Sequence, residues 1–243
     1  MNQYNLGFIS DADIFKHIEE TVKLYSTSIN LDAFNKNIID PIKLTFDSKV
    51  YGRSLKETIT NECIRQMDKS NNNSIGYFHQ NIFKYAGNGW TVPKEGFDVV
   101  NNDLHIFVEM KNKHNTMNSA SAQKTYINMQ NKLLEDDKST CMLVEVIASR
   151  SQDKPWIVSV NKKQFCNEHI RRVSMDKFYE IVFGDEDAFC KLCKAIPKIL
   201  DDVVIKAKTS GNTVFSELEA ISPDINKSLF LLAFKTYEGF NDF

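Results

Sequence analysis

The sequence lacks any apolar run that approaches the roughly 18 residues needed to span a bilayer. Its first residues, Met1-Asn2-Gln3-Tyr4-Asn5-Leu6-Gly7, also lack the basic start and apolar stretch of a secretory signal. The five cysteines are an odd number, which suits reduced thiols better than a disulfide framework. We therefore expect a cytoplasmic protein with no membrane segment.

The sequence also has no internal repeat, no long low-complexity linker and little net charge. Its 243 residues, 42% hydrophobic and 26% charged, are typical of a globular protein with a buried core. The formal net charge of −2 neither supports nor excludes nucleic acid as a partner. However, residues 111–134 contain four lysines and no Asp or Glu. A locally basic surface of this kind would suit phosphate groups bound in one cleft.

The spacing of apolar residues predicts helices, then two hairpin strands, a helix, two strands and further helices. Helices are expected at 10–25, 54–67, 75–85, 120–134, 174–183, 186–207 (with a kink or break at Pro197) and 226–237, and non-hairpin strands at 140–148 and 156–160. The polar segment 68–74 is predicted to be a loop. This order indicates an α/β fold with a central mixed β-sheet flanked by α-helices. We expect a single domain over 1–243, with N-terminal helices in 1–90, the sheet core in 91–165 and C-terminal helices in 166–243.

The segment 96–111 predicts a β-hairpin. Two short apolar runs are joined by a polar turn at Asn101-Asn102-Asp103. Side chains alternate along a strand, so Glu109, Lys111 and Lys113 should share one face of the second strand. Asp98 at the start of the hairpin then brings a second carboxylate to the same end.

Asp98, Glu109 and Lys111 are residue types that suit a divalent metal and phosphodiester hydrolysis. Mg²⁺ prefers hard oxygen ligands and needs only one or two carboxylates from the protein. A lysine on the same strand face can orient or help deprotonate the attacking water and stabilise the developing charge on phosphate. The alternative is an ordinary solvated strand edge, because an Asp followed by Glu-x-Lys occurs by chance in many chains.

This segment resembles the PD-(D/E)XK nuclease superfamily, with Asp98 as the first acid and Glu109-Met110-Lys111 as the (D/E)XK element. Phe97 stands where the signature has proline, a position that varies in the superfamily. A narrower resemblance covers about 40–197 and is to a type II restriction endonuclease family that recognises GGNCC-type sites. It rests on three runs: Val108-Glu109-Met110-Lys111-Asn112-Lys113-His114-Asn115-Thr116-Met117-Asn118, Ile75-Gly76-Tyr77-Phe78-His79-Gln80-Asn81-Ile82-Phe83 and Gly89-Trp90-Thr91-Val92-Pro93.

The resemblance implies a restriction-endonuclease-like core and Mg²⁺-dependent hydrolysis of double-stranded DNA at a short palindrome, leaving 5′-phosphate ends. It implies Asp98 and Glu109 as metal ligands and Lys111 as the catalytic lysine. A homodimer is the simplest assembly on a two-fold symmetric site. A cognate methyltransferase in the same system is also implied. Two alternatives stay open: another nuclease of the superfamily, acting in repair or on DNA structures, and a non-catalytic DNA-binding protein on the same fold.

A helix-borne acid beside the metal is common in related nucleases, and the resemblance permits Glu62 in this catalytic role. Glu62 is preferred to Glu57 because Glu57 and Ser54 have the spacing of a capping box. An ordinary surface acid is the alternative for Glu62.

The polar stretch after the catalytic strand, with the start of the next helix, is the predicted DNA-binding segment. Its candidate residues are Asn112, Lys113, His114, Asn115, Asn118, Gln123 and Lys124. A simpler interpretation is a turn-rich loop that caps the helix through Asn118 or Ser119.

Two further features have mainly structural interpretations. His79 lies among aromatic residues and is expected to be a packed core residue, with a contact to DNA as the alternative. Cys190 and Cys193 have the spacing of a zinc site, but their place in an amphipathic helix favours two buried thiols.

Overall fold

The computed structural model describes residues 3–114, 116–160, 163–204 and 211–234. Contacts divide the chain into two compact units, one within 1–23 and 75–205 and the other within 24–74 and 206–243. The expectation of one nuclease domain over the whole chain stays a prediction. Within the described ranges, no helix is both long enough and apolar enough to cross a membrane.

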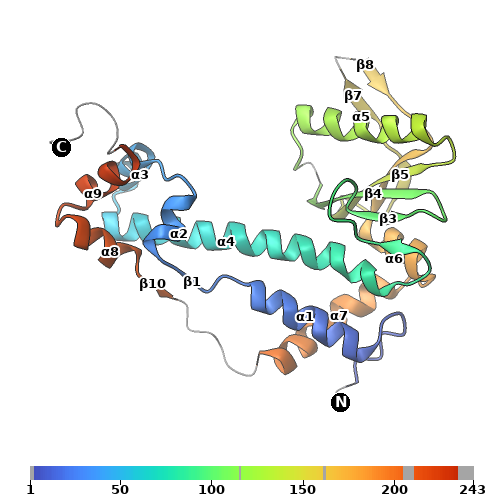
Figure 1. The fold of residues 1–243 in the computed structure, drawn as a ribbon, viewed down its shortest axis with the longest axis horizontal. Helices are drawn as coiled ribbons and strands as arrows, with labels where there is room; N and C mark the ends of the chain where they lie inside the picture. The colour runs from blue at the N-terminus through green and yellow to red at the C-terminus, as the bar shows by residue number, and fades with distance from the viewer. Residues whose placement is uncertain (1–2, 115, 161–162, 205–210, 235–243) are drawn as a thin grey trace. The chain divides into compact units, whose positions relative to one another are not determined.

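A six-stranded sheet forms the centre of the first unit, with strand order β2-β3-β4-β5-β9-β6 (Figure 1). The strands are β2 (Trp90–Thr91), β3 (Val99–Asn101), β4 (Ile106–Lys113), β5 (Thr140–Ile147), β6 (Asp153–Pro155) and β9 (Ile170–Ser174). Strand β4 pairs antiparallel with β3 and parallel with β5, and β5 pairs parallel with β9. The prediction of a mixed sheet flanked by helices is therefore confirmed.

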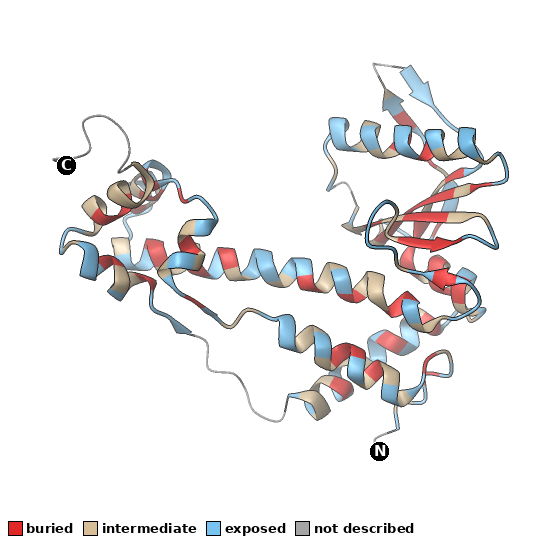
Figure 2. Ribbon diagram, viewed as in Figure 1, coloured by how far each residue is buried: buried red, intermediate tan, exposed pale blue. Residues whose placement is uncertain are grey.

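The sheet is covered on both faces because its central strands carry apolar side chains on both. On one face Val108 and Met110 share a core with α1 (Asp11–Leu24), α6 (Met175–Phe183) and α7 (Ala188–Val203). On the other face, Phe107 and Leu143 pack with Tyr126 and Met129 of α5 (Ser119–Glu135). Figure 2 shows buried residues along the strands and exposed residues on the outer sides of the helices. The 3₁₀ helix η1 (Ile82–Tyr85) leads into the sheet.

The second unit is mainly helical. It contains α2 (Leu31–Lys36), α3 (Pro41–Val50), α8 (Val214–Ile221), α9 (Ile225–Phe234), the two-stranded parallel sheet of β1 (Ser28–Ile29) and β10 (Gly211–Asn212), and most of α4 (Leu55–Asn81). Ile59 and Cys63 of α4, four residues apart on one helical face, are fully buried in the core of this unit with Phe34 and Leu218. The capping box is also confirmed, since the Ser54 N–H donates to Glu57 at 2.8 Å and the Glu57 N–H to Ser54 Oγ at 3.2 Å.

The loop predicted at 68–74 is wrong, because α4 continues through it. Asn and Ser side chains there would normally compete with the helix by bonding to nearby backbone. Instead, Asn71 is held by the backbone of Ser26, with distances of 2.8 Å to its nitrogen and 3.3 Å to its oxygen. Ser74 Oγ donates to the Ser70 carbonyl oxygen at 3.3 Å. The contact with Ser26 occupies the Asn71 side chain, and the Ser74 bond runs along the helix to the carbonyl four residues before it, so the helix continues through the segment.

Strand β9 lies in the segment 166–243 that was expected to be helical. Its centre holds Arg171 and Arg172, so it does not form an apolar run. The expected strand at 156–160 is shortened to β7 (Val158–Val160), which pairs with β8 (Lys163–Phe165) in a separate two-stranded sheet.

The expectations for α7 are partly corrected. Of the kink or break expected at Pro197, the break is absent, because the helix continues through this residue. Cys190 and Cys193 are exposed, not buried. The inward side of α7 carries Leu192 and Ile199 instead, both fully buried.

Candidate active site

The hairpin of β3 and β4 places Glu109 and Lys111 on one face of the sheet. Val108 and Met110 point into the core on the opposite face, as strand alternation requires. Lys111 Nζ lies 2.7 Å from Glu109 Oε1, and the two side chains are 29% and 25% exposed. The predicted pairing of an acid and a lysine on one strand face is therefore present, and both groups can still reach solvent.

Asp98 lies directly before β3 and is fixed by backbone hydrogen bonds to β4. Its N–H donates to the Val108 oxygen at 2.8 Å, and its Oδ2 accepts from the Met110 N–H at 2.7 Å. Burial raises the pKa of Asp98, as does the charge of Glu109, while the Met110 N–H and Lys111 oppose the rise. The structure therefore brings Asp98, Glu109 and Lys111 together at one end of the hairpin.

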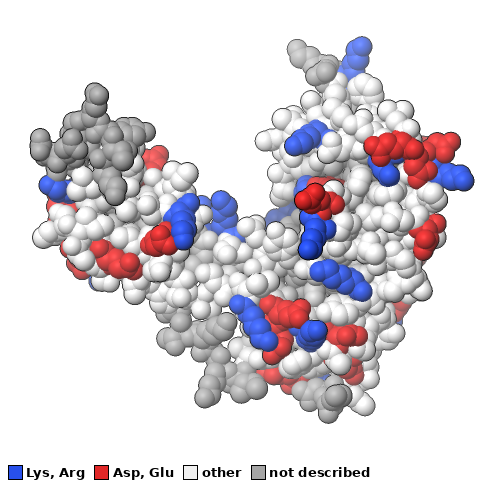
Figure 3. Space-filling view, viewed as in Figure 1, with Lys and Arg blue, Asp and Glu red and all other residues white. Residues whose placement is uncertain are grey.

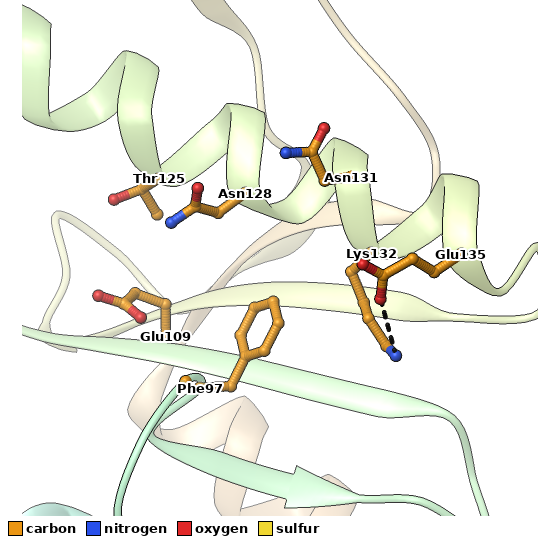
Figure 4. Close-up of a pocket in the computed structure, with 8 residues that line it drawn as sticks. Phe97, Glu109, Thr125, Asn128, Asn131, Lys132 and Glu135 are labelled. Atoms are coloured by element: carbon orange, nitrogen blue, oxygen red, sulfur yellow. Dashed lines mark hydrogen bonds and ion pairs between the residues drawn. The ribbon is translucent and has the colours of Figure 1, made fainter.

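A cavity of about 270 Å³ opens over Glu109, between β4 and helix α5. Its lining residues are Gly96, Phe97, Glu109, Thr125, Asn128, Asn131, Lys132 and Glu135. In Figure 4 the side chains of Thr125 and Asn128 lie above the Glu109 carboxylate, on the side of α5 that faces the strand. Sequence reasoning missed these helix residues, although their spacing of three and four places them on one helical face.

The predicted DNA-binding residues have mixed surroundings. Lys113 and Lys124 are exposed, whereas Asn112 and Gln123 are half-buried. Asn118 is the N-cap of α5, because its side chain accepts from the Ser121 N–H at 2.8 Å. Of the two caps expected from the sequence, Asn118 is the one that forms, and Ser119 is the first residue of the helix. Asn115 lies outside the described residues.

His114 belongs to a half-buried ionic cluster next to the site, with the buried Glu145 at its centre. Glu145 of β5 is paired in register with Lys111 of β4 and is only 1% exposed. Arg172 Nη2 donates to Glu145 Oε1 and lies 2.8 Å from His114 Nδ1, which in turn is 3.1 Å from Glu145 Oε2. Burial raises the pKa of Glu145, but the hydrogen bonds from Arg172 and His114 outweigh it and lower the pKa overall. This cluster was not predicted, because Glu145 lies inside an apolar run whose pattern indicates only a buried strand.

Comparison with known proteins identifies the family of the chain. Residues 6–205 match the model of the Eco47II restriction endonuclease family. The chain belongs to this family. It is 32% identical to the type II restriction enzyme Sau96I of Staphylococcus aureus, over 94% of this chain and 93% of that enzyme. It is 29% identical to the type II restriction enzyme Eco47II of Escherichia coli, over 82% and 88% of the two chains. The protein is thus a site-specific restriction endonuclease, and the predicted function is confirmed.

Restriction endonucleases hydrolyse the phosphodiester bonds of double-stranded DNA. The side chains at one end of the hairpin can therefore be compared with the ligands that a divalent cation would need for this reaction. The donor set of this chain fits a hard divalent cation, because Asp98 and Glu109 offer carboxylate oxygens at one place. Among the described residues, no cluster of three or more His, Cys, Asp or Glu could hold a metal. A cation held by two carboxylates keeps coordination positions for water and for phosphate oxygens. Such a site suits Mg²⁺ better than one in which every ligand comes from the protein.

Glu62 has partners of its own in the second unit of this Eco47II-family endonuclease. Its oxygens accept from Arg65 at 2.6 Å through both Nε and Nη2, and from Gln66 Nε2 at 3.0 Å. This bidentate pair gives the residue a structural explanation. The catalytic role that the resemblance permitted for Glu62 stays a prediction.

His79 packs against aromatic side chains in the first unit of the endonuclease. Its ring lies 5.2 Å from that of Phe78. Its Nδ1 is buried and has no hydrogen-bond partner within the part of the chain that the structure describes. Burial lowers the pKa of His79 to about 4, and the neighbouring His17 adds to this effect. The core interpretation of His79 is supported over a contact with DNA.

This low pKa predicts a loss of stability in mild acid. Between about pH 6.5 and pH 4 the unfolded chain binds a proton at His79 that the folded chain does not. The free energy of unfolding should therefore fall as the pH drops through this window, by up to about 3 kcal/mol. Urea unfolding at several pH values would measure it. His79→Gln should flatten the dependence, whereas His169→Gln, at an exposed position, should not; equal slopes for both variants would contradict the assignment.

Proposed function

We propose that Asp98 and Glu109 hold Mg²⁺ and that Lys111 acts on the water that attacks the DNA phosphate. The observation that carries this proposal is the joint position of two carboxylates and an ammonium at one end of the hairpin, beside an open cavity. When bound there, the ion supplies positive charge that offsets the charge of the phosphate and makes a water more acidic.

The residues of the chain have separate tasks in this reaction. The Met110 N–H holds the Asp98 carboxylate against β4, the strand that also carries Glu109. Lys111 donates hydrogen bonds to the attacking water and to a phosphate oxygen, which orients the water and stabilises negative charge that grows during attack. The attacking water gives up a proton to solvent as its oxygen bonds to phosphorus, the bond from phosphorus to the 3′ oxygen breaks, and that oxygen takes up a proton from solvent. The products are a 5′-phosphate and a 3′-hydroxyl.

The proposed substrate is double-stranded DNA with a short GGNCC-like palindrome. This recognition sequence comes from the resemblance of the three motif runs, with the similarity to two type II restriction enzymes as support. A two-fold symmetric site would be cut by a homodimer with one active site for each strand. A cognate methyltransferase would protect the host DNA, and reduced thiols at all five cysteines agree with action in the cytoplasm.

On the face drawn in Figure 3, basic and acidic side chains are interspersed over the described residues. On this face (Figure 3) no broad basic surface is present among the described residues, so we propose that DNA is held by a local group of basic side chains near the hairpin. The lysines at 111, 113 and 124 would supply that local charge.

Digestion of a plasmid of known sequence tests the proposal. With Mg²⁺, the purified protein should give discrete fragments whose ends map to GGNCC-like sites and carry 5′-phosphates. With a chelator it should give none. A smear of products would contradict site-specific cutting, ends at unrelated sequences would overturn the proposed site, and cleavage in chelator would overturn the role of the metal.

A further inference from the structure

Helix α5 presents a row of neutral polar side chains to the cavity that contains Glu109. Thr125, Asn128 and Asn131 line this cavity, and in Figure 4 Thr125 and Asn128 are the two that lie over the carboxylate. Asn128 and Asn131 are exposed and Thr125 is half-buried, so all three can meet a ligand. They come from the middle turns of a helix whose neighbouring side is anchored by buried Tyr126 and Met129.

The charges of this wall restrict what it can bind. Lys132 is the lysine of α5 that lines the cavity, and its Nζ lies 4.4 Å from the centre of the Phe107 ring and 3.5 Å from Glu135 Oε2. A free ammonium opposite Glu109 would form an ion pair with it and compete with a metal or with Lys111. Amide and hydroxyl groups donate hydrogen bonds without capturing the carboxylate. The wall is therefore suited to donate hydrogen bonds to an anionic ligand whose negative charge is balanced by a cation beside Glu109.

We propose that Asn128, assisted by Thr125, binds a backbone phosphate of the DNA strand being cut, next to the scissile bond. The inference rests on the proposed function, because it takes the bond to be cut at Asp98, Glu109 and Lys111. The Asn128 side-chain NH₂ donates to a phosphate oxygen and so fixes the strand along the cavity between α5 and β4. Asn128 is a positioning residue: it acts by placing the phosphate and takes no part in bond making.

The test uses Asn128→Ala and a matched control on the same helix. Alanine is a good helix former at an exposed position, so this variant should fold as well as the parent. Gln130→Ala makes a comparable change two residues further, about 160° around a helix of 3.6 residues per turn. Gln130 does not line the cavity. Asn128→Asp is a second variant of nearly equal volume that removes the donor and adds a negative charge near Glu109. Thermal unfolding would verify that all three are folded.

Affinity for a duplex with the mapped site would be measured by fluorescence anisotropy with Mg²⁺ present, in a Lys111→Met background that keeps the DNA intact. Loss of a hydrogen bond to a charged group should weaken binding about 10-fold or more in Asn128→Ala. The loss should be larger in Asn128→Asp and small in Gln130→Ala. Single methylphosphonate replacements along the cut strand then locate the contact. One of them, beside the mapped cut, should weaken binding by the parent but not weaken Asn128→Ala further.

The outcomes separate the two proposals. If the wild-type protein fails to cut, or the Lys111→Met protein cuts normally, the proposed function fails. If wild type cuts but Asn128→Ala and Asn128→Asp bind like Gln130→Ala, the inference on α5 is overturned. It is also overturned if Asn128→Ala weakens binding but is coupled to no phosphate of the cut strand, since Asn128 would then contact a base or only support the fold.

Discussion

Replacing Lys111 with methionine should slow single-turnover cleavage about 10³-fold while leaving DNA affinity within a few-fold of wild type; positioned acid–base groups typically contribute 10²–10⁴-fold. Methionine keeps the aliphatic stem of the side chain, so the half-buried strand face stays filled. What it loses is the ammonium, which lies 2.7 Å from Glu109 and is the proposed donor to water and phosphate. The loss should therefore appear in the rate of the chemical step at saturating enzyme.

Lys113→Met is the matched comparison, because Lys113 is on the same strand face but exposed at the strand end. It should lower the affinity for DNA and make binding less dependent on salt, as loss of a phosphate contact does. The two variants thus separate chemistry from binding. If Lys111→Met cut at the wild-type rate, or lost only affinity as Lys113→Met does, the proposed role of Lys111 would be wrong.

Replacing Arg172 with methionine should destabilise the protein by about 2–3 kcal/mol, less than the roughly 3–5 kcal/mol of a fully buried pair, because Glu145 is buried but the Arg172 side chain is 20% exposed. Glu145 is 1% exposed and would be left without its main cation. The folded-state pKa of Glu145 is lowered by Arg172 and His114, so its ionised form stabilises the fold above the ordinary pKa of glutamate. That contribution is lost as the pH falls through the lowered value. Without Arg172, burial should raise the pKa of Glu145 and move the loss to higher pH.

Urea unfolding of Arg172→Met at pH 7 would measure this effect. Arg171→Met is the control, because Arg171 is the preceding residue of β9 but pairs with Asp153 at a partly exposed edge, with side chains 24% and 34% exposed. It should cost no more than about 1 kcal/mol. Adding Glu145→Gln to Arg172→Met should recover part of the loss, since a neutral amide is cheaper to bury than a charge. Equal losses for Arg171→Met and Arg172→Met would contradict a buried pair.

The candidate site could be predicted in part because its information is local. Asp98 and Glu109-Met110-Lys111 are 11 to 13 positions apart on one hairpin, so strand alternation and a short turn are enough to bring them together. The wall that α5 adds to the cavity was out of reach. Asn128 faces Glu109 only because Tyr126 and Met129 bury the neighbouring side of the helix against the sheet, and that packing sets the rotation of the helix.

The predictions of helices and strands also succeeded where local patterns decide the structure and failed where distant contacts decide it. Apolar periodicity was sufficient for β5 and for α5, where side-chain patterns and burial agree. It failed at 68–74, where polar residues remain helical because Ser26 holds Asn71. It also failed at β9, where arginines are tolerated in the sheet because Glu145 and Asp153 pair with them. In each case the deciding partner lies far away in sequence, and single-segment patterns carry no information about it.

By itself, the sequence determined that this protein has an α/β core and a hairpin that carries two acids and a lysine, because periodicity and local spacing are properties of neighbouring residues. Its restriction-endonuclease type came from the resemblance of the motif runs to a known family. Only the tertiary structure decided that Arg172 and His114 form an ionic cluster with the buried Glu145 beside Lys111, and that Thr125 and Asn128 lie over Glu109 (Figure 4). Those contacts join β4 to β5, β9 and α5, elements that meet only when the sheet and its covering helix are packed.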